Sequence, residues 1–412
     1  MSGTLNGQDQ SFITTTSQDN LSEISDGRLA EQNSGNLATA IYGRQLVADH
    51  AFIAQQTYAA AVQSGATVDT SPDAMQQSQT AQLQTLSGAA FDQQYLSNEA
   101  QSNAQSVMDG QTEAASGQSP AVEQFNSLLV PFQAQHLLQA QLLQASEMGT
   151  APPASTQPTG SPGLALAPSG PLNAQDQTFI QQQASDNASE IQAGQLAETQ
   201  SGDQVVSVYG RWLVLDHSVL SASLLPLAQA EGVTPTTTPD AQAAAMNATL
   251  QGLTGSAFDV QYLQDEVQSN IQGIGYLEQE IYNGADPALV ALAQAALPLQ
   301  EQHLAGAVQA NVALLLGADD QTGAPSTPAG QIAAALGNFT AQAVVAAAEQ
   351  LASPSAYGFS ASGSGLFPAV PGAGTSNLAS LTAPASSASA MLIPSTLSTP
   401  SILPSLGSQQ TA

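Results

Sequence analysis

The sequence contains one stretch of about 140 residues twice, and this repeat constrains the fold more than any other feature. LNGQDQSFI, ending at Ile13, returns as LNAQDQTFI, ending at Ile180, and YGRQLVADH, ending at His50, returns as YGRWLVLDH, ending at His217. The offset of 167 residues, from His50 to His217, is the same for every repeated motif. Because insertions collect in loops, a repeat without gaps predicts one fold present twice.

Composition predicts the boundaries around these copies. We expect the first copy to cover 1–150 and the second to cover 172–318. The segment 151–171 between them is rich in Pro, Gly and Ser, which is typical of a linker. From 319 to 412 the chain shifts to Ala, Ser, Pro, Gly and Thr, which predicts a disordered, low-complexity tail in which 332–351 could form one Ala-rich helix.

The apolar residues of each copy follow the period of a helix. Tyr42, Leu46, His50 and Ile53, for example, are spaced by four, four and three residues. No segment alternates as a strand does. Each copy therefore predicts four long helices, packed as an antiparallel bundle, and one short helix. We expect the short helix to begin at Ser71, as N-cap, with Pro72 in its first turn, and the last helix to begin at Ser119-Pro120.

Charge and composition exclude several function classes. The chain has 32 acidic residues against three Arg and no Lys, which gives a net charge of -29. Nucleic-acid binding is excluded because phosphate contacts need clustered Lys and Arg, and an anionic lipid surface would repel the chain. The absence of Cys excludes disulfides and thiolate metal sites. No signal peptide is expected from MSGTLNGQDQSF, and no transmembrane segment is expected because no run approaches 18 apolar residues.

The four histidines of the chain occupy matched positions on the predicted core faces of the two copies. Glu23, His50 and His136 come from three helices of the first copy, and carboxylate and imidazole groups on facing helices are how bundles build metal sites. One reading is therefore an iron, manganese or zinc site in each copy. Its candidate ligands are Glu23, His50, His136, Glu190, His217 and His303, with Glu99, Asn103, Glu266 and Asn270 as a second shell.

The alternative is a buried polar network without a metal, since a His paired with a Glu satisfies both groups. The usual di-metal pattern contains two Glu-x-x-His units, but here Gln133 precedes His136 by three residues and Gln300 precedes His303. No nucleophile and base can be paired, so we predict no catalytic residues, no enzyme, and no cofactor other than these metals.

Other repeated residues are expected to be structural. Arg44 and Arg211 lie off the His stripe, and an ion pair with a carboxylate on another helix is their expected role. Asp49 and Asp216, directly before a His, are expected to face outward or sideways and to bond a neighbouring helix.

The order of these motifs resembles a known family. N-x-x-E-I-x-x-G-x-L-A (20–30 and 187–197) is followed by L-V-x-D-H, G-x-x-F-D-x-x-Y and P-x-x-x-x-H-L in both copies. This pattern resembles the ferritin-like bacterial domains of unknown function that are labelled predicted outer-membrane or periplasmic proteins. The resemblance implies two tandem ferritin-like four-helix bundles and a periplasmic or extracellular location. It implies no activity.

Two functions follow from these observations. The first is a non-catalytic structural protein of the cell envelope or exterior, with a protein partner bound through its helical surfaces or its tail. The second is a metal-binding ferritin-like protein. Because carboxylates without cations repel one another, we also expect an acidic working environment and greater stability near pH 5 than near pH 8.

Overall fold

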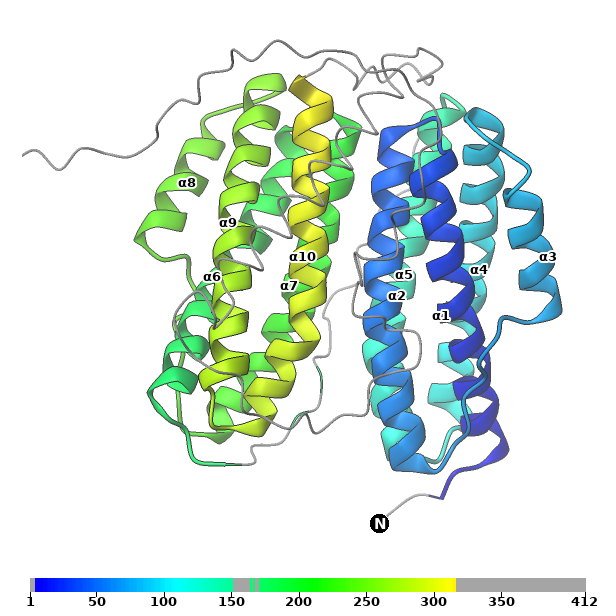
Figure 1. Ribbon diagram of the computed structural model, residues 1–412, viewed down its shortest axis with the longest axis horizontal. Coiled ribbons are helices and arrows are strands. Elements are labelled where there is room, and N and C mark those ends of the chain that lie inside the picture. The colour runs from blue at the N-terminus through cyan, green and yellow to red at the C-terminus, as the bar shows by residue number, and fades with distance from the viewer. Residues whose placement is uncertain (1–3, 151–163, 165, 167–169, 316–412) are drawn as a thin grey trace, which may run out of the picture. The chain divides into compact units, whose positions relative to one another are not determined.

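In the computed structural model, every regular element is a helix among the residues that the structure describes, which are 4–150, 164, 166 and 170–315 (Figure 1). The first copy contains α1 (Gly7–Asn33), α2 (Leu37–Ser64), α3 (Ala74–Leu83), α4 (Ala89–Ser116) and α5 (Pro120–Glu147). The second contains α6 (Ala174–Gln200), α7 (Gln204–Ala230), α8 (Ala241–Gln251), α9 (Ser256–Asn283) and α10 (Pro287–Leu315). The predicted all-α fold and its repetition are confirmed. The predicted tail, with 332–351, and most of the predicted linker lie outside the described residues.

Each bundle consists of four long helices with one crossover connection. In the first bundle, α1 packs beside α2 and α4, and α5 packs beside the same two helices. The backbone N–H of Gly88 donates to the carbonyl of Asn33, and the Asn6 amide donates to the carbonyl of Ser116, so α4 begins where α1 ends and ends where α1 begins. The crossover from α2 to α4 therefore spans the length of the bundle, and α5 ends at the opposite end from the start of α1.

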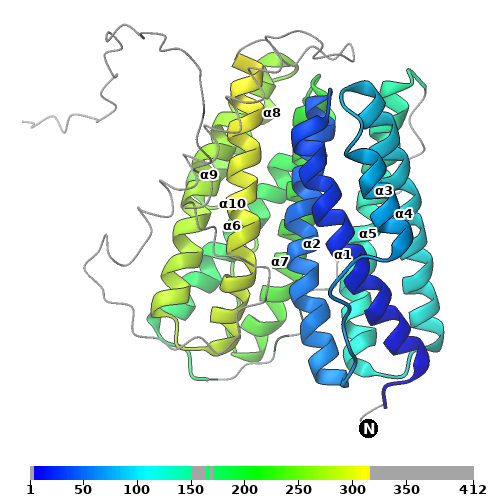
Figure 2. The same cartoon turned by 45° about the vertical axis from the view of Figure 1, so that its right-hand side comes forward.

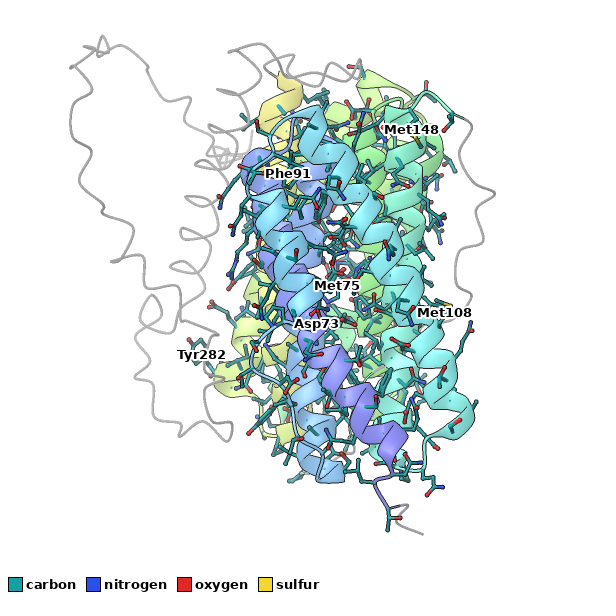
Figure 3. The ribbon with its side chains drawn as sticks, turned by 90° about the vertical axis from the view of Figure 1, so that its right-hand side faces the viewer. Asp73, Met75, Phe91, Met108, Met148 and Tyr282 are labelled. Carbon is teal, nitrogen blue, oxygen red and sulfur yellow. The ribbon has the colours of Figure 1, made fainter. Side chains whose placement is uncertain are left out.

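The short helix α3 lies on this crossover and packs against α1 and α4 (Figure 2). Its N-cap is Asp73 (Figure 3), so the prediction that Ser71 caps it, with Pro72 in its first turn, was wrong. The Asp73 carboxylate accepts from the backbone N–H of Gln76 at 2.8 Å, and the Gln76 side chain accepts from the backbone N–H of Asp73. This reciprocal pair satisfies two backbone donors, and a helix begun at Ser71 would lose it. Asp240 caps α8 in the second bundle.

The start of α1 is tied to the turn between α4 and α5. Asn6 and Asp9 form a capping box, and the Asp9 carboxylate also accepts from the backbone N–H groups of Gln118 and Ser119, both at 3.0 Å. Burial raises the pKa of Asp9, but the backbone donors Asn6, Ser119 and Gln118 outweigh it and hold that pKa below its usual value. The corresponding Asp176 has the same role in the second bundle.

Glycines allow α1 and α2 to approach closely. A Cβ added at Gly43 would lie 2.5 Å from the Ala30 Cβ and 2.8 Å from the Gly27 carbonyl oxygen. Gly194 and Gly210 make the same contact between α6 and α7. Only glycine permits such contact between helix backbones.

The cores combine aliphatic and aromatic side chains with many buried polar groups. Phe91 is buried and stacks on Tyr95 with ring centroids 5.5 Å apart, whereas the labelled Met75, Met108 and Met148 project from the surface (Figure 3). Among the described residues, α7 is the one helix long and apolar enough to cross a membrane, but more than half of its most apolar stretch is buried within the protein. A core helix of a bundle has the same properties.

Candidate functional site

The two histidines of the first bundle lie side by side in its interior. His50 on α2 and His136 on α5 are both completely buried, and their ring centroids are 5.4 Å apart. The Nδ1 of His50 lies 2.9 Å from the side-chain oxygen of Asn20 on α1, and the Nε2 of His136 lies 2.7 Å from the Asp49 carboxylate on α2. These two contacts connect three of the four long helices.

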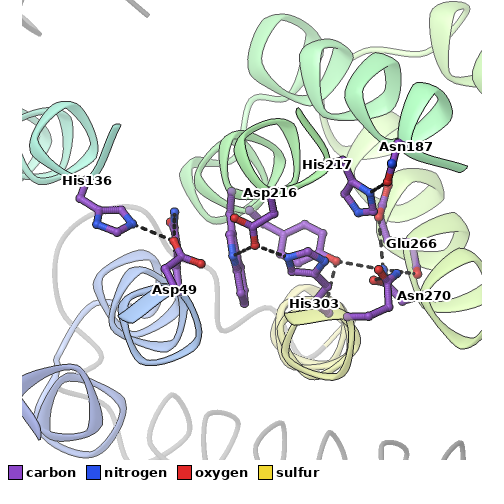
Figure 4. Close-up of polar contacts among 12 residues, drawn as sticks. Asp49, His136, Asn187, Asp216, His217, Glu266, Asn270 and His303 are labelled. Atoms are coloured by element: carbon purple, nitrogen blue, oxygen red, sulfur yellow. Dashed lines mark hydrogen bonds and ion pairs between the residues drawn. The ribbon is translucent and has the colours of Figure 1, made fainter. Parts of the chain in front are cut away.

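The second bundle repeats this geometry (Figure 4). His217 Nδ1 lies 2.9 Å from the Asn187 oxygen, His303 Nε2 lies 2.7 Å from the Asp216 carboxylate, and the two rings are 5.4 Å apart. Each aspartate also has a second donor on its own helix, four residues earlier. That donor is the Gln45 amide for Asp49, at 3.2 Å, and the Trp212 indole for Asp216, at 2.9 Å.

These partners fix which ring nitrogen carries a proton. An amide or carboxylate oxygen accepts, so His50 donates through Nδ1 and His136 donates through Nε2. Burial, together with the neighbouring imidazole, lowers the pKa of His50 and of His303 well below the usual value, and burial lowers the pKa of His217 to about 3. The remaining nitrogens, Nε2 of His50 and Nδ1 of His136, are buried lone-pair sites without a hydrogen-bond partner, and the second bundle repeats them.

The predicted glutamates form a separate pair. Glu23 on α1 accepts from Ser102 on α4 at 2.7 Å. Glu99, also on α4, is buried beside it, and burial followed by the charge of Glu23 raises the pKa of Glu99 well above its usual value. Asn103 donates to the backbone carbonyl of Glu99 at 2.8 Å, and the equivalent Asn270 in the second bundle donates to that of Glu266 at 2.7 Å (Figure 4). Here too, burial and the charge of Glu190 raise the pKa of Glu266.

The predicted metal ligands of each bundle therefore form two separate pairs, one of histidines and one of glutamates. The structure brings the two histidines of each bundle together and pairs each first-helix glutamate with the α4 or α9 glutamate. In the described part of the chain, no group of three or more His, Asp and Glu side chains is arranged to hold a metal ion. The donor set thus does not match a di-metal carboxylate centre, and the metal site stays a prediction.

The direct partners of the imidazoles are not among the predicted site residues. Asn20 precedes Glu23 by three residues on α1, and its side chain, not a glutamate, is the partner of His50. Asp49 is completely buried, so it does not face outward, but it bonds a neighbouring helix as expected. The signal that could have found it is the donor four residues earlier, present as Gln45 in one copy and Trp212 in the other.

The expected ion pairs of the arginines are present. Arg44 contacts Glu31 on α1 at 2.7 Å, and Arg211 contacts Glu198 on α6 at 3.3 Å. Both pairs connect the first two helices of a bundle.

Fold and polar core together define a protein of two consecutive helical-bundle domains with matched interiors. The chain belongs to the family described as domain of unknown function DUF4142, whose model matches residues 1–143 and 161–310. No curated protein and no solved structure matches the chain.

Proposed function

We propose that the chain is a non-catalytic structural protein of the cell envelope or exterior, whose histidines hold its bundles together. The observation that carries this proposal is that all four imidazoles are completely buried and hydrogen-bonded to Asn or Asp side chains of another helix. The family resemblance supports the location.

A neutral imidazole suits this task because it is both rigid and directional. Its protonated nitrogen must meet an acceptor, so a one-residue slip between α2 and α5 would leave the Nε2–H of His136 without an acceptor. A buried donor without an acceptor costs about 1–3 kcal/mol, which penalises every other register. The network therefore supports a unique packing of each bundle, and this role needs neither catalysis nor a metal.

Metal analysis of the full chain, purified without a tag, tests the structural role. We expect no stoichiometric iron, manganese or zinc, and unchanged helicity and melting temperature after chelation. The double variant His50→Ala, His217→Ala serves as a probe, since it should lose stability in metal-free buffer. Stoichiometric metal that disappears in this variant would overturn the structural proposal. Fractionation of cells that produce the protein tests the location.

Metal binding is the second candidate, and one observation favours it. Each bundle buries two imidazoles side by side, and each of these rings has one nitrogen without a partner, such as Nε2 of His217 and Nδ1 of His303. A metal with low coordination number would satisfy both lone pairs. Iron, manganese or zinc would need further ligands, which Glu23 and Glu190 could supply only after a rearrangement. A protein that stays metal-free in excess iron(II), manganese and zinc would exclude this candidate.

A further inference from the structure

The second bundle contains a cavity of about 360 Å³ that is lined by acidic side chains. It lies between α6, α8 and α9, closed partly by the segment before α8, and it has the size of a small-molecule site. Five carboxylates line it, and no Arg does; these five are Asp186, Glu190, Asp240, Asp265 and Glu266.

The carboxylates on the cavity wall have fewer donors than their oxygens can accept. Glu190 is only 2% exposed, and one of its oxygens accepts from the Ser269 hydroxyl, while its Oε2 has no donor. The Oδ2 of Asp265 is likewise buried without a partner. Burial, followed by the charges of Glu190 and Asp240, raises the pKa of Asp186 well above its usual value. A buried carboxylate is costly unless it meets a donor or a cation, so this cavity is incomplete as it stands.

The first bundle shows what is missing. Asp19, the equivalent of Asp186, accepts from the Gln76 amide at 2.6 Å and from the Ser106 hydroxyl at 3.3 Å. Ala243 and Gly273 occupy these two positions in the second bundle, and Ala243 lines the cavity. Where the first bundle supplies donors from α3 and α4, Asp186 keeps only a long contact with the Gln183 amide, at 3.5 Å, and has open space beside it.

Two further replacements change the wall of the second bundle. Asp265 stands where the first bundle has Asn98, and Tyr276 stands where it has Asp109, so these two positions together hold one acidic residue in each bundle. The second bundle has gained an aromatic side chain on the wall. An aromatic face attracts an ammonium group, and it does so best in a site shielded from water.

We propose that this cavity binds a small organic cation with at least two ammonium groups, an aliphatic diamine or polyamine, through Asp186, Glu190 and Glu266. An ammonium group offers three donors, which suits carboxylates that have few donors of their own. Several carboxylates from α6 and α9 on one wall favour a ligand with several charges. A divalent metal fits less well, because in the described residues no three acidic or imidazole groups are arranged around one point. This ligand goes beyond the proposed structural role and does not depend on it.

Calorimetric titration of the full chain with spermidine at fixed ionic strength tests the proposal. We expect saturable binding with one site per chain, putrescine binding at least tenfold more tightly than butylamine, and at least a tenfold loss in Asp186→Asn. Because a chain of net charge -29 attracts any polyamine loosely, the decisive variant leaves the charge unchanged.

Ala243→Gln is that variant, since it installs the side chain that reaches Asp19 in the first bundle. Ala243 is half-buried on α8, so the helix tolerates the change, and circular dichroism checks that the variant is folded. We expect at least a tenfold loss of spermidine affinity. The matched control is Ala244→Gln, which places the same side chain on the exposed neighbour outside the cavity and should leave the affinity unchanged.

Three results would overturn the proposal. They are the absence of saturable spermidine binding, equal affinities of Ala243→Gln and Ala244→Gln, and saturable binding of Mg²⁺ or Ca²⁺ alone. None of them bears on whether the buried histidines stabilise the bundles.

Discussion

The buried Asp216 on α7 accepts hydrogen bonds from side chains on two helices of the second bundle. His303 on α10 donates from Nε2, and Trp212 on α7 donates from its indole nitrogen. Burial raises the pKa of Asp216 well above its usual value, while its ionised form is the one that both donors stabilise. The two hydrogen bonds therefore offset part of the cost of burying a carboxylate at this position.

Replacing this carboxylate by an amide of the same shape measures its contribution. We expect Asp216→Asn to lower the free energy of unfolding by about 1–3 kcal/mol, because the amide oxygen is a weaker acceptor for the His303 and Trp212 donors. Urea unfolding followed by circular dichroism gives the value. Asp69→Asn, on an exposed carboxylate, is the control and should change stability by less than about 0.5 kcal/mol. Equal effects of the two substitutions would contradict the structural role of Asp216.

For single residues, the sequence predicts which face of a helix a side chain occupies better than it predicts the hydrogen-bond partner of that side chain. Helical spacing placed all four imidazoles inside the bundles, because a period of 3.6 residues fixes which face a residue occupies. It could not choose between Asn20 and Glu23 as the partner of His50, since both lie near the core face within one turn. That choice depends on the relative shift of α1 and α2, which packing decides.

The helices are placed by local signals that recur in both bundles. The Asn6–Asp9 capping box fixes where α1 begins, and proline at the first position fixes the start of α5. Helix number, order and most boundaries could thus be predicted from the sequence. The start of α3 could not, because Ser71 and Asp73 are both good caps and only Asp73 has a Gln three residues later that completes the reciprocal pair.

The glycine contact between α1 and α2 gives a second prediction. Gly43→Ala should lower the free energy of unfolding by about 1–3 kcal/mol, because its Cβ would overlap Ala30 and the Gly27 backbone. Thermal unfolding measures the change. Gly275→Ala is the matched control, since no atom lies within 4 Å of the added Cβ and the loss of backbone freedom in the unfolded chain should stabilise the protein by about 0.5–1 kcal/mol. A destabilised Gly275→Ala would show that helix packing is not the cause.

Across the whole molecule, buried carboxyl groups dominate the response to pH. Burial raises the pKa of Asp19, Asp26, Glu113 and Glu147 to about 7 and that of Glu280 to about 8. A group whose pKa is higher in the folded state contributes stability below its unfolded pKa, near 4, and loses that contribution as the pH rises through the folded value. The lowered histidine pKa values act oppositely, since their contribution is present above about 6.5 and is lost on acidification.

We therefore expect a higher melting temperature near pH 5 than near pH 8, because the shifted carboxyl groups outnumber the shifted imidazoles. Calorimetry at constant ionic strength checks this. Added salt screens repulsion between exposed charges but leaves the buried shifts in place, so the difference should persist at high salt. A stability maximum on the alkaline side would contradict the assignment.

The single crossover of each bundle also determines how its chain can be rearranged. Because α1 begins at one end and α5 finishes at the other, a circularly permuted domain would need a bridge along the full helix length. For helices of 27 or 28 residues this distance is about 40 Å, which requires on the order of twelve extended residues. Head-to-tail duplication is therefore the natural way to extend such a domain.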